Sequence, residues 1–507
     1  MNNQCIDVAN QEVATCSLRR MAVRALVSAL LMSSSGVLVA QELTFDQMKS
    51  ELNEKSLPLV NLTVDVASLN KTTYVEGEIE IVDYQQRTEP GEESVTYACE
   101  LRYRGAMAAA QQKKSFAVKL YNEKGKDLDA NIFGIREENS WILDAMAIDR
   151  LRMRNRVCFD VWNEISRTPY ETSYDDRNGT EGVFVEVFIN GDYNGLYCMT
   201  DKIDRKLLGL KKAKEDDEGL VTIKGLLYKG DSWGSSDNLL SYEEDEVDQD
   251  TWNIWELQYP DDYPSIDTWQ PLMDLIDFCS SQTTDEAFAQ EYEEYFFADN
   301  LIDYVVFTLG MNVGDNAYKN TFLSTVDITS GHRYMITPWD MDMSLGGHCN
   351  GEYNDTLASL TRYNNIGPFN RLIPQNIDGF FDRVSMRMLE FQQSVLSVDS
   401  IFHRLDAYAS LFTESGAWER EIAKWDGIPV PLKETIAEEV DYVKDWYVRN
   451  FDHLHEHFDT SVGIEDVATD NVTHTIYSLY GDRLPVDNPS SLLRGIYIVN
   501  GKKIMIK

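Results

Sequence analysis

The chain has 507 residues, a length that fits about three structural units or one large domain with two separate ends. Hydrophobic residues make up 43% and charged residues 26%, which excludes collagen-like, coiled-coil and wholly disordered proteins. The formal net charge of -39 repels phosphate backbones, so we expect no nucleic-acid partner, and it favours metal ions and basic protein segments.

The first forty residues are typical of a secretory signal peptide. Its basic region contains Arg19, Arg20 and Arg24. The apolar run at 25–32 is shorter than the ~20 residues that span a membrane, so cleavage after Ala40 is favoured over anchoring. Met21 is an alternative start. We therefore expect residues 1–40 to be removed, and the mature protein to be exported, either secreted or at the cell surface, without a transmembrane span.

Five cysteines follow the expected cleavage position: Cys99, Cys158, Cys198, Cys279 and Cys349. Their number is odd and their spacing is wide, and no Cys-x-x-Cys pair is present, so neither a disulfide framework nor a zinc site is indicated. We expect buried free thiols.

The first half of the mature chain is rich in strand patterns. Apolar and polar residues alternate in several parts of 57–121, which predicts strands. Apolar residues spaced by four predict a helix over 148–166. Strand patterns return over 182–199, where Asn190-Gly191 is typical of a hairpin turn.

The second half changes character. Residues 209–264 are acidic and rich in Trp and Tyr, and we interpret them as an insert-like excursion. Residues 270–310 and 380–458 are mainly helical in pattern, and 463–507 contain short strands around the turn signal Asn500-Gly501. The sequence therefore predicts an α+β fold with two lobes, a strand-rich N-terminal one and a helix-rich C-terminal one, plus a small all-β C-terminal module.

One segment carries a pattern that phosphoryl transfer uses. Asp315 and Asn320 lie five residues apart and precede a short strand, and a second strand ends at Asp340 and Asp342. In such an arrangement one Asp accepts the proton of the substrate hydroxyl, while the Asn and a later Asp bind Mg²⁺ that bridges nucleotide phosphates. The alternative is that Asp315 and Asn320 cap turns, and that Asp340 and Asp342 form a solvated loop or a calcium site.

Candidate cations for the phosphates lie upstream. Lys119 ends a strand-like Phe-Ala-Val-Lys segment of the kind that holds nucleotide phosphates, Lys114 is equally within reach, and Arg104-Gly105 is suited to a turn near phosphate. Alternatively, Lys119 is an ordinary outward-facing strand residue. A Gly-x-Gly-x-x-Gly loop is absent from the sequence, so we expect no ordinary protein-kinase nucleotide lid.

Together these segments resemble the CotH kinase family, the atypical kinases similar to spore coat protein H. The resemblance rests on motifs in the same order along the chain: Leu57-Pro-Leu-Val, Arg104-Gly105, Lys113-Lys-Ser-Phe-Ala-Val-Lys-Leu120, Trp141-Ile-Leu with Asp149, Leu151-Arg-Met-Arg-Asn155, Tyr193-Asn-Gly-Leu-Tyr197, Asp315–Asn320 and Pro338-Trp-Asp-Met-Asp342. It implies a kinase-like domain, expected over 45–460, that uses ATP with Mg²⁺ or Mn²⁺ to phosphorylate protein Ser or Thr. The substrate would be a protein, either basic or of a surface or coat.

By motif position the resemblance implies that Asp315 is the catalytic Asp, that Asn320 is a metal ligand, and that Asp340 and Asp342 share the remaining metal binding. The sequence departs from the family pattern at two places. The Ala-rich residues 106–110 follow Arg104-Gly105, so the contacts with phosphate on this side are expected to differ from those of the family, and Asp201 stands where the family usually has Glu.

Two alternatives to an exported kinase stay open. The first is a surface or secreted binding or structural protein on a catalytically inactive kinase-like fold. The second is a glycan hydrolase, suggested by Asp340 with Asp342 and by the aromatic stretch 233–269. Residues 463–507 resemble the sorting tails of exported Bacteroidota-type proteins, and the alternative there is a plain β appendage.

Overall fold

The computed structural model describes the residues 43–105, 108–174, 176–231, 238–243, 247, 251–317, 319–461, 476–477, 495–499 and 502–506. The signal peptide predicted for residues 1–40 lies outside them. Within the described ranges, no helix is both long enough and apolar enough to cross a membrane. The five cysteines after residue 43 form no disulfide there; four are buried, as predicted, and Cys349 is half-buried.

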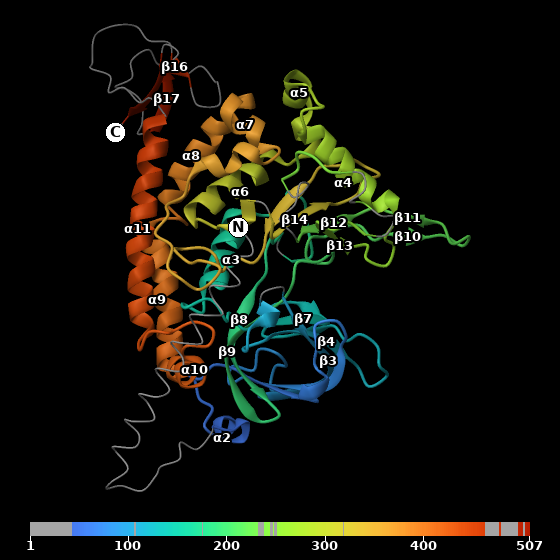
Figure 1. Ribbon diagram of the computed structural model, residues 1–507, viewed down its shortest axis with the longest axis vertical. Coiled ribbons are helices and arrows are strands. Elements are labelled where there is room, and N and C mark those ends of the chain that lie inside the picture. The colour runs from blue at the N-terminus through green and yellow to red at the C-terminus, as the bar shows by residue number, and fades with distance from the viewer. Residues whose placement is uncertain are drawn as a thin grey trace.

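Seven strands of the N-terminal half close into a barrel in the order β1-β2-β3-β4-β7-β9-β8 (Figure 1). Their bounds are β1 (Leu59–Val64), β2 (Val75–Val82), β3 (Ser94–Arg104), β4 (Ser115–Tyr121), β7 (Ser140–Asp144), β8 (Gly182–Ile189) and β9 (Asp192–Thr200). The parallel pair of β1 and β8 closes the barrel, and all other neighbours are antiparallel. The predicted hairpin is confirmed, because Asn190 and Gly191 both have positive φ between β8 and β9.

The helix predicted over 148–166 is α3 (Arg154–Ile165), and its start is six residues later than expected. The preceding residues instead form a loop in which the Asp149 carboxylate accepts hydrogen bonds from the backbone N–H groups of Leu151 and Arg154 at 2.9 and 2.8 Å. These bonds satisfy donors at the entrance of the helix.

A second sheet, of four strands, has the order β13-β12-β14-β15. Its strands are β12 (Leu226–Gly230), β13 (Trp255–Tyr259), β14 (Thr321–Thr325) and β15 (Met335–Pro338). The prediction of an insert-like excursion over 209–264 is therefore wrong, because β12 lies between β13 and β14 in this sheet. Local sequence patterns do not reveal this position of β12, because it pairs with a strand more than ninety residues later.

The tryptophans that the structure describes in the aromatic stretch 233–269 belong to the core. Trp252, Trp255 and Trp269 are 4%, 2% and 1% exposed, and Trp233 lies outside the described residues. The glycan-hydrolase alternative thereby loses three of the four aromatic side chains on which it rested.

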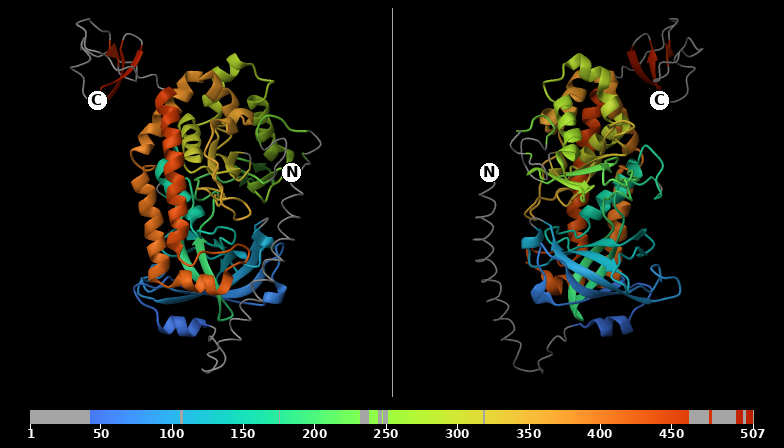
Figure 2. Two further views of the ribbon diagram at one scale, coloured as in Figure 1. Left: turned by 60° about the vertical axis from the view of Figure 1, so that its left-hand side comes forward. Right: turned by 90° about the vertical axis from the view of Figure 1, so that its right-hand side faces the viewer.

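The C-terminal half is helical, as predicted for 270–310 and 380–458. The helices are α4 (Ile266–Cys279), α5 (Asp285–Tyr295), α6 (Ala298–Gly310), α7 (Phe369–Gln375), α8 (Phe380–Gln392), α9 (Val398–Glu414), α10 (Ala417–Trp425) and α11 (Ile436–Ser461). The long helices α9 and α11 lie side by side, and α10 packs on β9 of the barrel (Figure 2). Helix α10, near the end of the chain, thus contacts the barrel formed by the first part of the chain.

Smaller elements complete the fold. They are α2 (Phe45–Ser50), β5 (Ala130–Asn131), β6 (Glu137–Glu138), β10 (Lys214–Glu215), β11 (Val221–Thr222), β16 (Ile476–Tyr477), β17 (Gly495–Val499), β18 (Lys502–Ile506), and the 3-10 turns η1 (Val66–Ser68), η2 (Ala108–Ala110), η4 (Asp315–Ala317), η5 (Leu360–Asn365) and η6 (Ile377–Gly379). The strands expected near the C-terminus are present as the three-stranded sheet β16-β17-β18. The domain boundaries 45–460 and 463–507 stay predictions.

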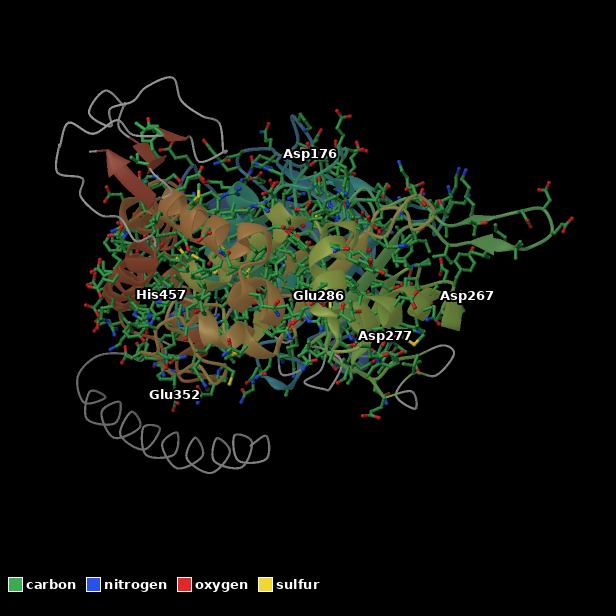
Figure 3. All side chains as sticks on the ribbon, turned by 90° about the horizontal axis from the view of Figure 1, so that it is seen from above. Asp176, Asp267, Asp277, Glu286, Glu352 and His457 are labelled. Atoms are coloured by element: carbon green, nitrogen blue, oxygen red, sulfur yellow. The ribbon has the colours of Figure 1, made fainter. Side chains whose placement is uncertain are left out.

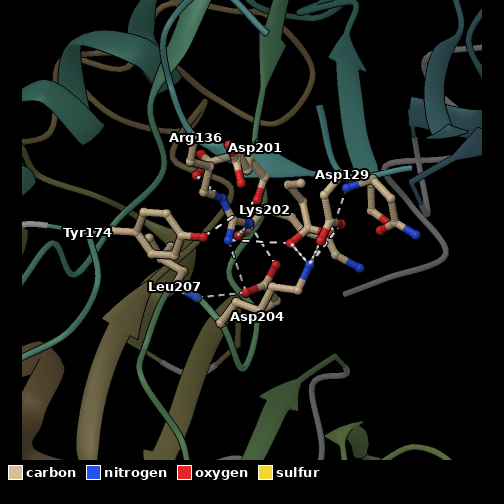
Figure 4. A network of polar contacts seen from close by, with 12 residues as sticks. Asp129, Arg136, Tyr174, Asp201, Lys202, Asp204 and Leu207 are labelled. Atoms are coloured by element: carbon tan, nitrogen blue, oxygen red, sulfur yellow. Dashed lines mark hydrogen bonds and ion pairs between the residues drawn. The ribbon is translucent and has the colours of Figure 1, made fainter. Parts of the chain in front are cut away.

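The segment that leaves the barrel after β9 is fixed by a buried polar network (Figure 4). The guanidinium of Arg136 is fully buried and lies 2.8 Å from Asp201 Oδ2 and 2.6 Å from Asp204 Oδ2. Arg177 contacts the same oxygen of Asp201 at 2.8 Å. Burial raises the pKa of Asp201, and the two arginines oppose this. The Asp in place of the usual Glu therefore has a structural position here, between two arginines.

Acidic residues, which give the chain its net charge of -39, occur in different parts of the molecule. Figure 3 labels Asp176, Glu286 and Glu352, which lie at separate places around the molecule and belong to different parts of the chain.

Helix α10 lies very close to β9 at Gly195. The φ of this glycine is +119°, and an added Cβ would lie 2.7 Å from both Glu421 Oε2 and Trp425 Nε1, whereas Gly191, with a φ of +88°, has open space around it. We expect Gly191→Ala to cost only its backbone strain of about 1–3 kcal/mol, and Gly195→Ala to lower the free energy of unfolding further. Urea denaturation of both variants measures the difference, and equal losses would contradict the packing.

Candidate active site

A cleft opens where the end of the barrel faces the four-stranded sheet. It holds about 1170 Å³ of empty space, counting the part open to solvent. The barrel side contributes the end of β3, the start of β4 and the loop after β7, and the sheet side contributes the end of β12 and the segments around β14 and β15. Residues far apart in the sequence therefore share one cavity.

Five of the residues singled out from the sequence line this cleft together: Arg104, Asp315, Asn320, Asp340 and Asp342. The two lysines singled out with them, Lys114 and Lys119, do not line it. The structure thus gathers the acidic and amide residues of the expected site and separates them from the expected lysines.

The segment from Asp315 to Asn320 is held as a tight loop after α6. Asn316 is buried, and its side-chain amide donates to the carbonyl oxygens of Asn320 and Trp339 at 2.6 and 2.8 Å. Asn320 has a φ of +57°, a left-handed conformation that this closure imposes. Its side-chain amide lies 3.5 Å from Asp315 Oδ2. The loop therefore places Asp315 and Asn320 side by side.

The segment that carries Asp340 and Asp342 is fixed by Asn155 of α3. The backbone N–H of Met341 donates to Asn155 Oδ1 at 3.1 Å, and Asn155 Nδ2 donates to Asp144 Oδ2 at 3.2 Å. Asp340 has a φ of +55°, again left-handed. Sequence analysis missed Asp144 as a site residue. Asp144 is the last residue of β7 and Asp340 follows β15 by two residues, but nothing local shows that β7 and β15 end at the same cleft.

The cleft is strongly acidic. Its lining includes Asp144, Asp149, Asp231, Asp315, Asp340 and Asp342, against the cations Arg104, Lys229 and Lys319. Asp340 is exposed to solvent within the cleft. The surrounding protein atoms nevertheless displace water from its carboxylate and raise its pKa; the charge of Asp144 raises this pKa further, and the charge of Arg104 lowers it. Burial raises the pKa of Asp342 well above its ordinary value, and neighbouring carboxylates, first among them Asp340, raise it further.

The donor atoms of the cleft suit a hard divalent cation. Among the described residues, no three His, Cys, Asp or Glu side chains are arranged as a ready-made metal site. Mg²⁺ does not require such a cage, because it usually takes one or two carboxylates and completes its shell with water and substrate phosphates. The carboxylate and amide oxygens of Asp340, Asp342 and Asn320 are ligands of the type that Mg²⁺ or Mn²⁺ prefers.

The two expected phosphate lysines have other contacts. Lys114 Nζ donates to the carbonyl of Ala109 at 2.7 Å. Lys119 lies 4.7 Å from the ring centre of Tyr74 and points away from the barrel interior, into which Val118 and Leu120 point. This placement fits the alternative interpretation of Lys119 as an outward-facing strand residue.

Other cations take their place in the cleft. Arg104 lies over the ring of Trp339, 5.6 Å from its centre. Lys319 lies 3.4 Å from Asp315 Oδ2, and Lys229 lies 2.9 Å from Asp231. Sequence analysis missed both lysines; Lys229 could not be found without knowing that β12 is part of the central sheet.

A family model described as CotH kinase protein matches residues 101–454. The chain belongs to the CotH kinase family. A search for relatives among curated proteins gave no match.

Membership of the CotH kinase family implies an atypical kinase that uses ATP. The matched range includes the cleft residues from Arg104 to Asp342. It ends before residues 463–507, whose similarity to a sorting tail stays a prediction.

The raised pKa of Asp342 predicts a stability effect in the absence of divalent metal. Because its folded pKa lies above its ordinary value of 3.8, ionisation of Asp342 lowers the stability of the folded state as the pH rises above that value. Asp342→Asn should therefore raise the melting temperature at pH 7 by about 1–3 °C, and the gain should disappear below about pH 4.

Calorimetry of metal-free protein across this pH range measures the effect. Asp231→Asn is the matched control, since Asp231 lines the same cleft but is paired with Lys229, and it should give no gain. A lower melting temperature for Asp342→Asn than for wild type at pH 7 would contradict the claim that the ionised Asp342 carboxylate destabilises the folded protein.

Proposed function

We propose that this protein is an atypical protein kinase that transfers the γ-phosphoryl group of ATP to a Ser or Thr hydroxyl of a protein substrate with the help of a divalent metal. The observation that carries the proposal is the cleft in which Asp315 and Asn320 lie side by side and share the cavity with Asp340 and Asp342. In this proposal the barrel is the N-terminal lobe of a two-lobed kinase-like fold and the helical part is the C-terminal lobe.

Asp315 is the proposed acceptor of the substrate hydroxyl proton. The Asn320 amide and the Lys319 ammonium both lie near its Oδ2 atom, at 3.5 and 3.4 Å. In the proposal these neighbours orient the carboxylate toward the substrate hydroxyl. Orientation of this kind supplies much of the catalysis in phosphoryl transfer.

Asn320, Asp340 and Asp342 are the proposed holders of Mg²⁺ or Mn²⁺, which neutralises developing charge on the phosphates when it is bound. The left-handed backbone at Asn320 and Asp340 supports this role, because such strain persists where the surrounding structure holds it and clusters at functional sites. The carboxylates of Asp340 and Asp342 also gain from a cation, since their mutual repulsion is then relieved.

The phosphates of ATP would meet Arg104 from the barrel side and Lys229 from the sheet side of the cleft. These two cations replace Lys114 and Lys119 in the proposal, because both lysines make their contacts outside the cleft. We keep the export of the protein, its secreted or surface location and a basic or coat protein as its substrate as proposals that rest on the sequence alone.

A second candidate is a surface or secreted binding protein on an inactive kinase-like fold. The observation that favours it is the wall next to Arg104, where Ala108 lies against Gly105 and lines the cleft. An alanine side chain cannot donate a hydrogen bond to phosphate, so this wall offers fewer contacts than a wall with Ser or Asn would. Turnover separates the two candidates.

Asp315→Ala tests the proposed reaction. We expect the purified wild-type protein to transfer label from γ-labelled ATP with Mg²⁺ or Mn²⁺ to itself or to a basic protein, and the variant to lose at least about 100-fold in rate because the proton acceptor is gone. Nucleotide binding should be retained, since Asp315 is not a proposed phosphate or metal ligand. Equal turnover by the variant would remove Asp315 from the mechanism, and wild type without transfer would favour the binding protein.

A further inference from the structure

A fully buried ionic cluster lies behind the cleft. It consists of Lys113, Arg152 and Glu421, and we refer to it as the Glu421 cluster. Glu421 Oε1 lies 2.7 Å from Lys113 Nζ and 2.8 Å from Arg152 Nε, and all three side chains are 0% exposed. The residues come from the segment before β4, the loop before α3 and helix α10, so one carboxylate joins three separate elements.

Arg152 links this cluster to the wall of the cleft. Its Nη1 donates hydrogen bonds to the carbonyl oxygens of Met146, Ala147 and Asp149, at 2.7, 2.8 and 2.7 Å. All three residues line the cleft. The guanidinium thus holds the loop 146–149 from behind, and a residue with one donor nitrogen could not make these contacts together with the Glu421 contact.

The same loop positions two carboxylates that line the cleft. It begins next to Asp144, which accepts a hydrogen bond from the backbone N–H of Met146 at 3.1 Å, and it ends at Asp149. Asp144, Asp149 and the proposed metal ligand Asp342 all line the same cleft. A displacement of the loop therefore changes the surroundings of a proposed metal ligand.

Glu421 fixes Arg152 because its own position is fixed by the barrel. Its second oxygen, Oε2, accepts a hydrogen bond from the backbone N–H of Leu196 in β9 at 2.8 Å, and Lys113 Nζ donates to the Leu196 carbonyl at 2.6 Å. Burial alone would raise the pKa of Glu421, but Lys113 and Arg152 hold it below its ordinary value. Glu421 is therefore a buried anion between two cations, and its removal leaves both cations unpaired.

We propose that Glu421 is a positioning residue for phosphoryl transfer, which acts through Arg152 to hold the loop 146–149 in the cleft wall. The proposal rests on the proposed kinase function. It makes helix α10, more than 260 residues from Arg152 in the chain, a determinant of the geometry around Asp144 and Asp149. Displacements of about 1 Å at such sites are known to reduce rates by up to about 100-fold.

A second carboxylate between α10 and the barrel provides a matched control. Glu186 of β8 is also 0% exposed in its side chain and pairs with Arg420 of α10 through two hydrogen bonds of 2.7 Å. Within the described part of the chain, its carboxylate accepts hydrogen bonds from Tyr193 and Arg420 and not from Arg152 or the loop 146–149. Glu186→Gln and Glu421→Gln should both weaken the attachment of α10, but only the second should reach the cleft.

The test measures hydrogen–deuterium exchange of residues 144–153, and kcat and KM for ATP, in wild type and both variants. We expect Glu421→Gln to raise exchange in 144–153 and to lower kcat at least about tenfold, while Glu186→Gln leaves both within about threefold of wild type. Unchanged exchange in Glu421→Gln, or equal effects in the two variants, would overturn the proposal. If Glu421→Gln raises exchange in 144–153 but the wild-type protein shows no turnover, the positioning of the loop is retained and the kinase function is rejected instead.

Arg152→Lys keeps the experiment informative if Glu421→Gln does not fold. Lysine preserves the positive charge beside Glu421 but lacks the Nη1 group that binds the three carbonyl oxygens. We expect the folded variant to show raised exchange in 144–153 and a kcat at least about tenfold lower. A variant with wild-type exchange and wild-type kcat would overturn the proposal.

Discussion

The repulsion between carboxylates in one cleft is the constraint on which the rest of the structure depends. Burial raises the pKa values of Asp340 and Asp342, and neighbouring carboxylates, including Asp144 and Asp315, raise them further. A chain that only had to fold would separate them or pair each with a cation. Here the cations Arg104, Lys229 and Lys319 are fewer than the carboxylates. The arrangement therefore stores an electrostatic cost that a bound divalent metal would relieve.

The surrounding structure is built to hold this arrangement against its own repulsion. The amide side chains of Asn155 and Asn316 fix the backbone of the two carboxylate-bearing segments. Behind the cleft, the Glu421 cluster fixes the loop 146–149 through Arg152. Further from it, Arg136 with Asp201 fixes the segment that leaves the barrel. These contacts are fully or partly buried, and removal from water strengthens hydrogen bonds and ion pairs.

The sequence predicted those features that depend on short separations along the chain. The hairpin at Asn190-Gly191 and most strands and helices follow local spacing. Asp315, Asn320, Asp340 and Asp342 could be grouped because one loop and the strand pair β14-β15 carry them in a single stretch of chain. The overall division into a strand-rich first part and a helical second part also follows from local periodicity.

Features that depend on long-range pairing could not be predicted in this way. Alternation along β4 separates two faces but does not say which one meets the cleft, and so Lys119 was selected although it lies beside Tyr74. Lys229 was missed because only the pairing of β12 with β14, which is not local in the sequence, brings the end of β12 to the cleft. Glu421 carries no local signal at all, since both of its cationic partners precede it by more than 260 residues.

The most direct test of the account is the binding of ATP to the purified protein by titration calorimetry, with and without Mg²⁺, in wild type and in the double variant Asp340→Ala/Asp342→Ala. The account predicts that Mg²⁺ strengthens ATP binding by wild type at least about tenfold and that the double variant loses this dependence. A double variant that binds Mg²⁺ and ATP as wild type does would show that the acidic cleft is not the metal–nucleotide site.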